Sequence, residues 1–224
     1  VARFVGKTCI LGLGYGMGHV KFRNTLALGM GGISLDIDEN EAQRIVNLYR
    51  NKNHKIASFW NRCNHALTEM VAGRSGSLCD IVHYDGEGII LPNKLRILYP
   101  ALCRGEDGYV YINNARTFRK LVAKRVMTGE QDGIDWTKIY GGKVTENIVQ
   151  ALARIVITEQ MASIGRHYHV AFQVHDEIII SVPDDELTNA QQLIVRKMSK
   201  PPSWAPTLPV DCEVGVGKNY GEAK

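Results

Sequence analysis

The 224-residue sequence lacks the features that would assign it at once to several protein classes. It has no apolar run of about 18 residues, the length that a membrane-spanning helix requires. Its five cysteines include no C-x-x-C pair, so neither a zinc site nor a disulfide framework is indicated. We therefore interpret the cysteines as reduced thiols and expect a cytoplasmic protein.

The composition is that of a folded protein. Hydrophobic residues make up 45% of the chain, which is enough for a sizeable core. The formal net charge is +4 at pH 7. A mildly basic chain is compatible with nucleic-acid binding, but the charge alone does not indicate it.

Hydrophobic spacing and turn residues predict an α+β fold, with a helical lobe followed by a lobe of helices and strands. Asp38 and Glu41 form a capping box that should start a helix. The pattern predicts helices over 3–16, 19–28, 38–50, 56–71, 143–164 and 185–198, short hairpins over 78–112, two strands around a turn at His175-Asp176, and a final short strand in the C-terminal tail.

The glycine-rich start of the chain does not fit the common nucleotide motifs. A P-loop ending in the Gly-Lys-Thr of 6–8 would need its first glycine at position 1, which is Val1. Either start for a dinucleotide fingerprint within 12–19 places another residue at the third glycine. Gly12 and Gly14 inside a helix cost about 1 kcal/mol each relative to alanine, so we expect a close approach to the backbone there.

A different pattern fits the same segment. Arg3, Lys7, Leu11 and Tyr15 stand four residues apart, so on an α-helix they form one stripe about 18 Å long. The two cations suit phosphates, and the aromatic ring suits stacking on a base. An ordinary exposed helix face gives the same spacing, so the stripe alone leaves both interpretations open.

A second candidate site is His175-Asp176-Glu177, at the tip of an apolar hairpin. Two adjacent carboxylates on a rigid hairpin suit a hard divalent cation, although aspartate is also common in turns for conformational reasons. His167 and His169 share one strand face and raise the possibility of zinc. The sequence offers no suitably spaced cysteine or third histidine to complete such a site.

Together these patterns resemble family A DNA polymerases, the group of bacterial DNA polymerase I and many phage replicases. The family's R-x₃-K-x₇-Y-G motif is matched by Arg3, Lys7, Tyr15 and Gly16, and its H-D-E motif by 175–177. The segments "LPNKLRILYP", "YGGKVTENIVQALAR" and "VGVGKNYGEAK" resemble phage-type members. The resemblance covers essentially the whole chain.

The resemblance implies part of a right-hand polymerase, with the fingers in 1–110 and the C-terminal palm in 111–224. Arg3 and Lys7 would bind the triphosphate of the incoming deoxynucleotide, Lys7 taking part in catalysis. Tyr15 and Gly16 would lie beside the DNA at the nascent base pair. Leu11 would face the sugar, where the family usually carries an aromatic residue, so the sugar selectivity is in question.

For the second motif, the resemblance implies that Asp176 and Glu177 are catalytic and bind Mg²⁺. His175 would contact the primer terminus, and Gln150 would reach the minor groove, where a donor checks pair shape with little sequence readout. The family often has asparagine four residues before that glutamine, whereas this chain has Glu146, so the match there is weaker.

Two-metal chemistry needs another aspartate, which the family carries upstream of the fingers. Because Val1 already lies within a motif, we expect a truncated or split polymerase, whose upstream segment or second chain supplies that aspartate. Primer–template DNA and deoxynucleoside triphosphates are the expected partners. Two alternatives stay open: a non-catalytic nucleic-acid-binding module, and a single-subunit RNA polymerase, which resembles H-D-S where this chain has Glu177.

Overall fold

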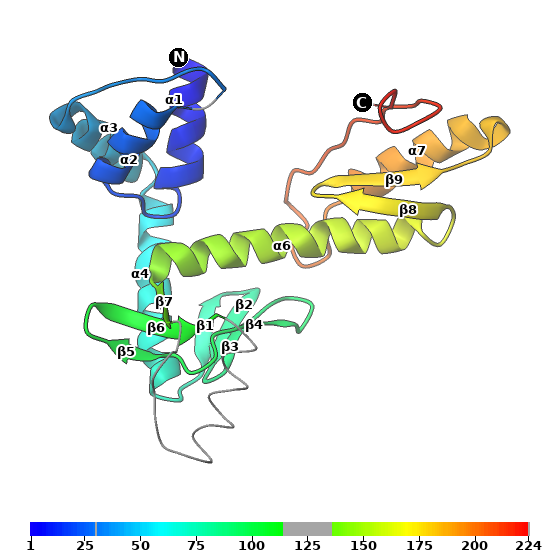
Figure 1. Ribbon diagram of the computed structural model, residues 1–224. Coiled ribbons are helices and arrows are strands. Elements are labelled where there is room, and N and C mark those ends of the chain that lie inside the picture. Colours follow the sequence, from blue (N-terminus) through cyan, green and yellow to red (C-terminus); the bar gives the residue numbers. More distant parts are fainter. Residues whose placement is uncertain (30, 114–135, 224) are drawn as a thin grey trace, which may run out of the picture. The chain divides into compact units, whose positions relative to one another are not determined.

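The computed structural model describes residues 1–29, 31–113 and 136–223 (Figure 1). The fold is α+β, as predicted, with helices and small antiparallel sheets. The chain divides into two compact units, Val1–Val149 and Gln150–Lys224. The assignment of 1–110 to fingers and 111–224 to palm concerns polymerase subdomains and stays a prediction.

The helices of the first unit lie close to their predicted positions. They are α1 (Ala2–Thr8), a π-helix η1 (Cys9–Leu13), α2 (His19–Leu28), α3 (Glu39–Lys52) and α4 (His54–Val71). Asp38 caps α3 by accepting a hydrogen bond from the Glu41 N–H at 2.8 Å. Gly73, just past α4, has φ +70° and ends that helix as predicted.

Two features of the first helices differ from the prediction. Residues 9–13 form a π-helix, and the helix ends at Leu13 instead of 16. Gly12 and Gly14 lack the side chains that favour a regular α-helix, and a local π-turn is a common result of an irregularity inside a helix. The predicted α-helical stripe therefore ends before Tyr15.

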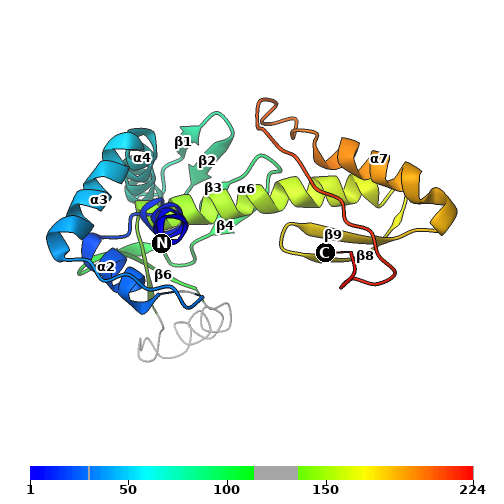
Figure 2. The same cartoon turned by 90° about the horizontal axis from the view of Figure 1, so that it is seen from above.

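A small core holds these helices together. Leu13, Phe22, Leu26, Ala42 and Val46 are fully buried in one cluster contributed by η1, α2 and α3. Helix α2 packs beside α3 (Figure 2). The apolar spacing of these segments fixes which faces turn inward and so leaves the opposite face of α1 exposed.

The predicted hairpins are present in two antiparallel sheets. The first has the order β1 (Gly76–Cys79), β2 (Val82–Asp85), β3 (Gly88–Ile90), β4 (Arg96–Leu98), and the second β5 (Cys103–Gly105), β6 (Gly108–Ile112), β7 (Trp136–Ile139). The Asp85 carboxylate accepts the N–H groups of Glu87 and Gly88 at 3.0 and 3.3 Å, which closes the β2–β3 turn.

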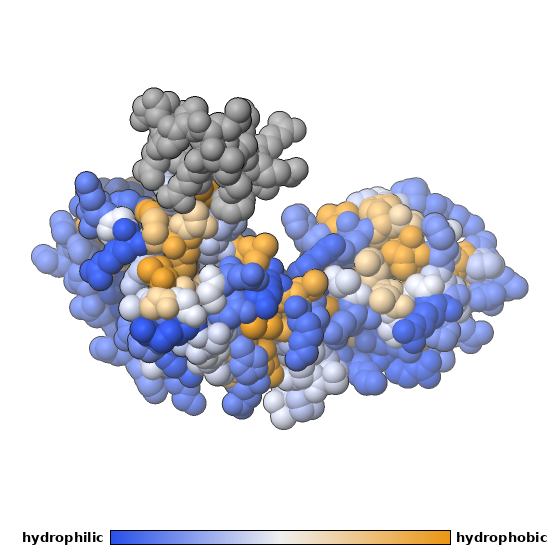
Figure 3. All heavy atoms as spheres, turned by 90° about the horizontal axis from the view of Figure 1, so that it is seen from below, coloured by the Kyte–Doolittle hydropathy of each residue, from blue (hydrophilic) through white to orange (hydrophobic). Residues whose placement is uncertain are grey.

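The second unit contains most of α6 (Gly141–Ile164), the hairpin of β8 (His169–Val174) and β9 (Glu177–Ser181), and α7 (Leu187–Met198). These elements agree with the predicted helix, hairpin and helix. Apolar side chains reach the surface of this unit on the face drawn at the right of Figure 3, and Phe172 of β8 is 46% exposed.

The predicted strand in the C-terminal tail is wrong. Among the described residues, none after α7 belongs to a strand. The tail instead satisfies its hydrogen bonds locally, because Glu222 and Ala223 both donate their N–H groups to the Asn219 carbonyl at 3.2 Å. No helix in the described part of the chain combines the length and apolarity that crossing a membrane requires.

Candidate functional site

The exposed face of α1 and η1 carries the first group of candidate residues. Arg3 and Lys7 are exposed, and Leu11 of the π-helix is 56% exposed. A Cβ atom at Gly6 would meet nothing within 4 Å, so the helix surface at Gly6, beside the two cations, is open. Three of the four stripe residues are therefore exposed on these first helices.

Tyr15 lies in a turn directly after η1 and is half-buried. The close approach predicted at the neighbouring glycines is confirmed, and the approaching groups belong to the protein itself. A Cβ at Gly12 would lie 2.7 Å from Met17 Cε, and one at Gly14 2.7 Å from the Ile10 carbonyl oxygen. Gly16 has φ +85°, a conformation that favours glycine.

The turn that carries Tyr15 is held from outside by α3 and α4. Trp60 donates its indole N–H to the Gly14 carbonyl at 3.0 Å. Arg50 donates to the Met17 carbonyl at 3.3 Å, and its guanidinium lies 5.9 Å from the centre of the Trp60 ring. These two residues fix the position of the turn relative to the helices of the first unit.

The second group of candidates lies on the β8–β9 hairpin of the second unit. Val174 pairs with Glu177, so His175 and Asp176 form the two-residue turn that the sequence predicts. His175 has φ +52°, a conformation that few side chains adopt. The turn thus brings His175, Asp176 and Glu177 together at one end of the hairpin.

A short chain of hydrogen bonds supports this turn. Gln173 donates its amide to the His175 carbonyl at 2.6 Å. Arg154 of α6 in turn donates a hydrogen bond to the Gln173 side-chain oxygen. The guanidinium therefore ties the hairpin tip to the helix beside it, which restricts where the His175 turn can lie.

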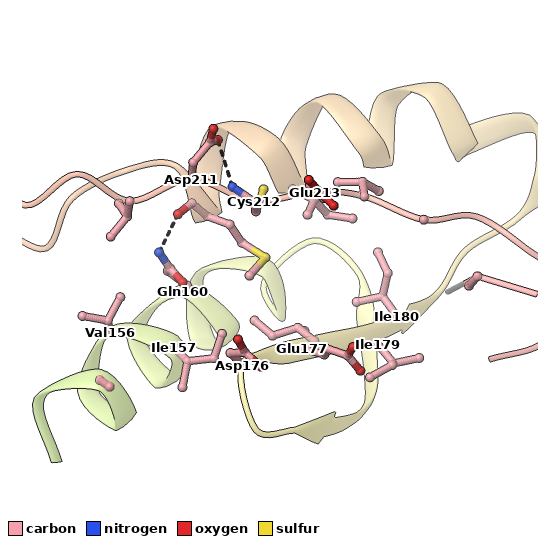
Figure 4. A pocket seen from close by; sticks show the side chains of 18 of the residues that line it. Val156, Ile157, Gln160, Asp176, Glu177, Ile179, Ile180, Asp211, Cys212 and Glu213 are labelled. Carbon is pink, nitrogen blue, oxygen red and sulfur yellow. Dashed lines mark hydrogen bonds between the residues drawn. The ribbon is translucent and has the colours of Figure 1, made fainter. Parts of the chain in front are cut away.

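The acidic residues of the hairpin line a cavity of about 1030 Å³ between α6, β9, α7 and the tail (Figure 4). Asp176 and Glu177 come from the hairpin side, whereas Asp211 and Glu213 come from the tail. Asp211 already accepts hydrogen bonds from Ser199 at 3.0 Å and from the Cys212 N–H at 2.9 Å. Asp211 is thus engaged in holding the tail.

The chemistry of Asp176 and Glu177 fits a hard divalent cation, because carboxylate oxygens are the preferred donors of such ions. They make up only part of a ligand set. In residues 1–29, 31–113 and 136–223, no group of three or more His, Cys, Asp or Glu side chains could hold a metal ion. This finding covers His167 and His169, the residues considered for zinc.

The remaining candidate, Gln150, is exposed on α6 at the start of the second unit. Glu146, one turn earlier, pairs with Lys143 at 2.9 Å. Gln150 belongs to the same unit as the hairpin, whereas Arg3, Lys7, Leu11 and Tyr15 belong to the other.

Sequence reasoning missed Trp60, Arg154, Gln173 and Tyr220. Tyr220 donates a hydrogen bond from its hydroxyl to Glu177 Oε2 at 2.6 Å. Its segment, "VGVGKNYGEAK", carries part of the resemblance, but no pattern within that segment points to a residue 43 positions earlier. Only the folded chain reveals such contacts.

Comparisons with known proteins match this chain to DNA polymerases. Residues 147–222, which include Gln150, the hairpin and Tyr220, match the family model described as DNA polymerase family A. The chain is 28% identical over 222 residues to the DNA polymerase of Bacillus phage SP02, which covers 96% of this chain and 32% of the phage protein. It is 32% identical over 73 residues to the thermostable DNA polymerase I of Thermus filiformis, which covers 33% of this chain and 8% of that protein.

These matches support the resemblance to DNA polymerase family A on which the sequence motifs agree. The chain spans about a third of the length of the phage relative.

Proposed function

We propose that this chain provides the fingers and the C-terminal palm of a right-hand, template-directed DNA polymerase, which adds deoxynucleotides to a primer 3′ end. The observation that carries the proposal is the β8–β9 turn, which holds Asp176 and Glu177 adjacent to each other within the segment that matches the family. A two-residue turn between paired strands presents both carboxylates on a rigid element.

The incoming nucleotide would bind the exposed face of α1 and η1. Arg3 and Lys7 offer two cations for the triphosphate, with the open surface at Gly6 beside them. Leu11 would present an apolar wall to the sugar, and Tyr15, on its clamped turn, an aromatic ring to the nascent pair. Phosphate contacts carry no information about the base, so these two cations would bind all four nucleotides with similar affinity.

The primer–template would contact the hairpin tip and α6. His175, with its carbonyl held by Gln173, would face the primer terminus. Gln150 would reach the minor groove with an amide, which can donate to the acceptors common to A·T and T·A pairs. Gly16, beside Tyr15, would let the DNA approach the backbone closely.

Asp176 and Glu177 would hold Mg²⁺ at the hairpin tip. When bound, the divalent ions lower the pKa of the attacking hydroxyl and stabilise the leaving group in phosphoryl transfer. Two-metal chemistry needs a further aspartate, which we propose comes from an upstream polymerase segment or from a second chain. The 224-residue chain alone would then be inactive.

Primer extension tests this proposal. A labelled primer–template is incubated with Mg²⁺ and one templated nucleotide, with the chain alone and with the chain joined to the segment that carries the further aspartate. We expect template-dependent incorporation only from the completed form, and deoxynucleotides in preference to ribonucleotides.

Each of the other outcomes would contradict one part of the proposal. A preference for ribonucleotides would indicate an RNA polymerase. Tight primer–template binding without incorporation in the completed form would indicate a non-catalytic binding module, and robust extension by the chain alone would contradict the incomplete site.

A further inference from the structure

We propose that Tyr220 is a positioning residue that holds the Glu177 carboxylate in its metal-binding orientation. This inference rests on the proposed function of the hairpin as a divalent-cation site. Tyr220 belongs to the C-terminal tail, 43 residues after Glu177, and its hydroxyl donates to Glu177 Oε2 at 2.6 Å. A hydrogen bond from a hydroxyl to a carboxylate at this distance is among the stronger kinds in proteins.

The Tyr220 ring is placed by the neighbouring strand. Its centroid lies 5.5 Å from that of Phe172, with the two ring planes at 73°, an edge-to-face contact. Phe172 pairs with Ile179, and Val174 with Glu177. Alternation along a strand therefore puts Phe172 and Glu177 on one face of the hairpin, and Tyr220 contacts both residues on that face.

The segment around Tyr220 is itself ordered by local hydrogen bonds. Asn219 donates its amide to Glu222 Oε1 at 2.6 Å, and the Lys218 N–H donates to Glu222 Oε2 at 3.0 Å. Asn219 Oδ1 accepts from the N–H groups of Gly221 and Glu222 at 3.1 and 3.2 Å. The ring is thus presented from a closed turn, so its position does not depend on Glu177 alone.

The Tyr220 hydroxyl uses only part of the accepting capacity of the Glu177 carboxylate. An ionised carboxylate has about four lone-pair positions on its two oxygens, and Tyr220 takes one of them. A glutamate side chain otherwise loses considerable rotamer freedom when it binds an ion. If Tyr220 holds the Glu177 side chain before the ion binds, less rotamer entropy is lost on binding. Outer hydrogen bonds orient the ligands of other metal sites in the same way.

The test is a Mn²⁺ titration of the 224-residue chain, followed by electron paramagnetic resonance, which counts free ions. Tyr220→Phe keeps the ring contact with Phe172 and removes only the hydroxyl. We expect its Mn²⁺ dissociation constant to rise about tenfold, the lower end of the effect of removing an outer partner from a metal ligand. Glu177→Gln should weaken binding at least as much, and adding Tyr220→Phe to it should have no further effect.

Tyr168→Phe is the matched control. Burial raises the pKa of the Tyr168 hydroxyl, and the nearby carboxylate of Glu186, which does not line the cavity, raises it further. The control variant therefore loses a tyrosine hydroxyl near a glutamate outside the cavity and should bind Mn²⁺ like the unaltered chain. If both tyrosine variants bind Mn²⁺ equally well, or if Glu177→Gln changes nothing, the positioning role is overturned.

Activity assays distinguish a failure of this inference from a failure of the proposed function on which it rests. In the completed polymerase, Tyr220→Phe should raise the Mg²⁺ concentration for half-maximal rate and leave the KM for the nucleotide unchanged, with excess Mg²⁺ restoring the rate. If no form polymerises while the Mn²⁺ effect persists, the proposed function fails and the positioning role stands. If the variant raises the nucleotide KM but binds Mn²⁺ normally, the positioning role fails.

Discussion

Trp60 donates its indole N–H to the carbonyl oxygen of Gly14, 46 residues earlier in the chain, at 3.0 Å. The bond joins α4 to the turn that follows η1. Because that turn carries Tyr15, the position of a proposed nucleotide-binding ring depends on a helix that contributes none of the motif residues. Gly14 itself is crowded, with the Tyr49 hydroxyl 3.3 Å from where a Cβ would stand.

Trp60→Phe should destabilise the first unit by about 1–3 kcal/mol, because it leaves the Gly14 carbonyl without its donor in a partly buried place. Urea unfolding of the chain, followed by circular dichroism, measures the change. Trp204→Phe is a useful control in the second unit. The Trp204 indole N–H is buried and has no hydrogen-bond partner among the described residues, so its removal breaks no hydrogen bond there. Equal losses in the two variants would show that the Trp60 hydrogen bond contributes little.

Local chemistry explains what the sequence predicts well. The helix at Asp38 begins where a short acidic side chain can accept the N–H of Glu41, and both residues lie within one turn. The turn at His175-Asp176 follows from two apolar β-branched runs with polar residues between them. Signals of this kind involve residues close together in sequence, so no knowledge of the folded chain is needed to find them.

What the sequence does not predict depends on contacts between distant residues. The π-helix over 9–13 and the tail's closed turn replace an expected α-helix and an expected strand. Gly12 and Gly14 indicate that other atoms approach the backbone closely, but only the structure shows that these atoms belong to Met17 and Ile10. Tyr220 reaches Glu177 through the path of the tail, which no short pattern encodes.

Cys63 should be the least reactive cysteine in the folded protein. Its side chain is fully buried, and burial raises the pKa of its thiol from 9.0 to about 11. The thiolate is the nucleophile, so at pH 8 almost none of it is present. We expect maleimide labelling, mapped by mass spectrometry, to modify half-buried Cys79 and Cys103 well before Cys63, and to modify Cys63 fully in urea.

The same shift has a consequence for stability. Because the folded pKa lies above the unfolded one, the neutral thiol favours folding at low pH, and this contribution is lost as the pH rises from about 9 to about 11. Cys63→Ala removes the titrating group and should flatten that part of the unfolding profile. Rapid labelling of Cys63 at pH 8 without denaturant would show that α4 opens locally.

Asp176→Asn should abolish chemistry in the completed polymerase while leaving primer–template affinity nearly unchanged. Asparagine keeps the shape of the side chain but loses the charge that a divalent cation requires. Metal ions supply several kcal/mol of transition-state stabilisation, so we expect the incorporation rate to fall at least roughly 100-fold. Rapid-quench incorporation and fluorescence anisotropy with labelled DNA measure the two quantities.

Asp211→Asn provides the control for Asp176, because both carboxylates line the same cavity. Asp211 holds Ser199 and the Cys212 N–H, so its substitution should loosen the tail and lower the melting temperature, with a much smaller effect on the rate. A similar loss of rate in both variants would mean that the reaction depends on the total negative charge of the cavity and not on Asp176 as a metal ligand. Near-normal turnover by Asp176→Asn would mean that Asp176 has only a structural role in the β8–β9 turn.

Lys7 and Leu11 are both exposed on the first helices, but their substitutions should have different effects. If Lys7 binds a phosphate as proposed, Lys7→Ala should cost about 1.5–3 kcal/mol and raise the KM about 10- to 100-fold for every nucleotide alike. Leu11→Tyr should leave that KM unchanged and restore an aromatic wall beside the sugar. It should therefore alter the incorporation rate and the preference for deoxy over dideoxy nucleotides.

Steady-state incorporation of the four deoxynucleotides and their dideoxy forms by both variants decides between these roles. Lys52→Ala, at the end of α3, removes an exposed cation outside the motif and controls for net charge. Leu11 stands in the π-helix, where its direction depends on the i→i+5 hydrogen bonding and not on four-residue spacing. If Leu11→Tyr leaves both the rate and the sugar preference unchanged, the π-helix turns this residue away from the sugar. The nucleotide would then lie along Arg3, Gly6 and Lys7 alone.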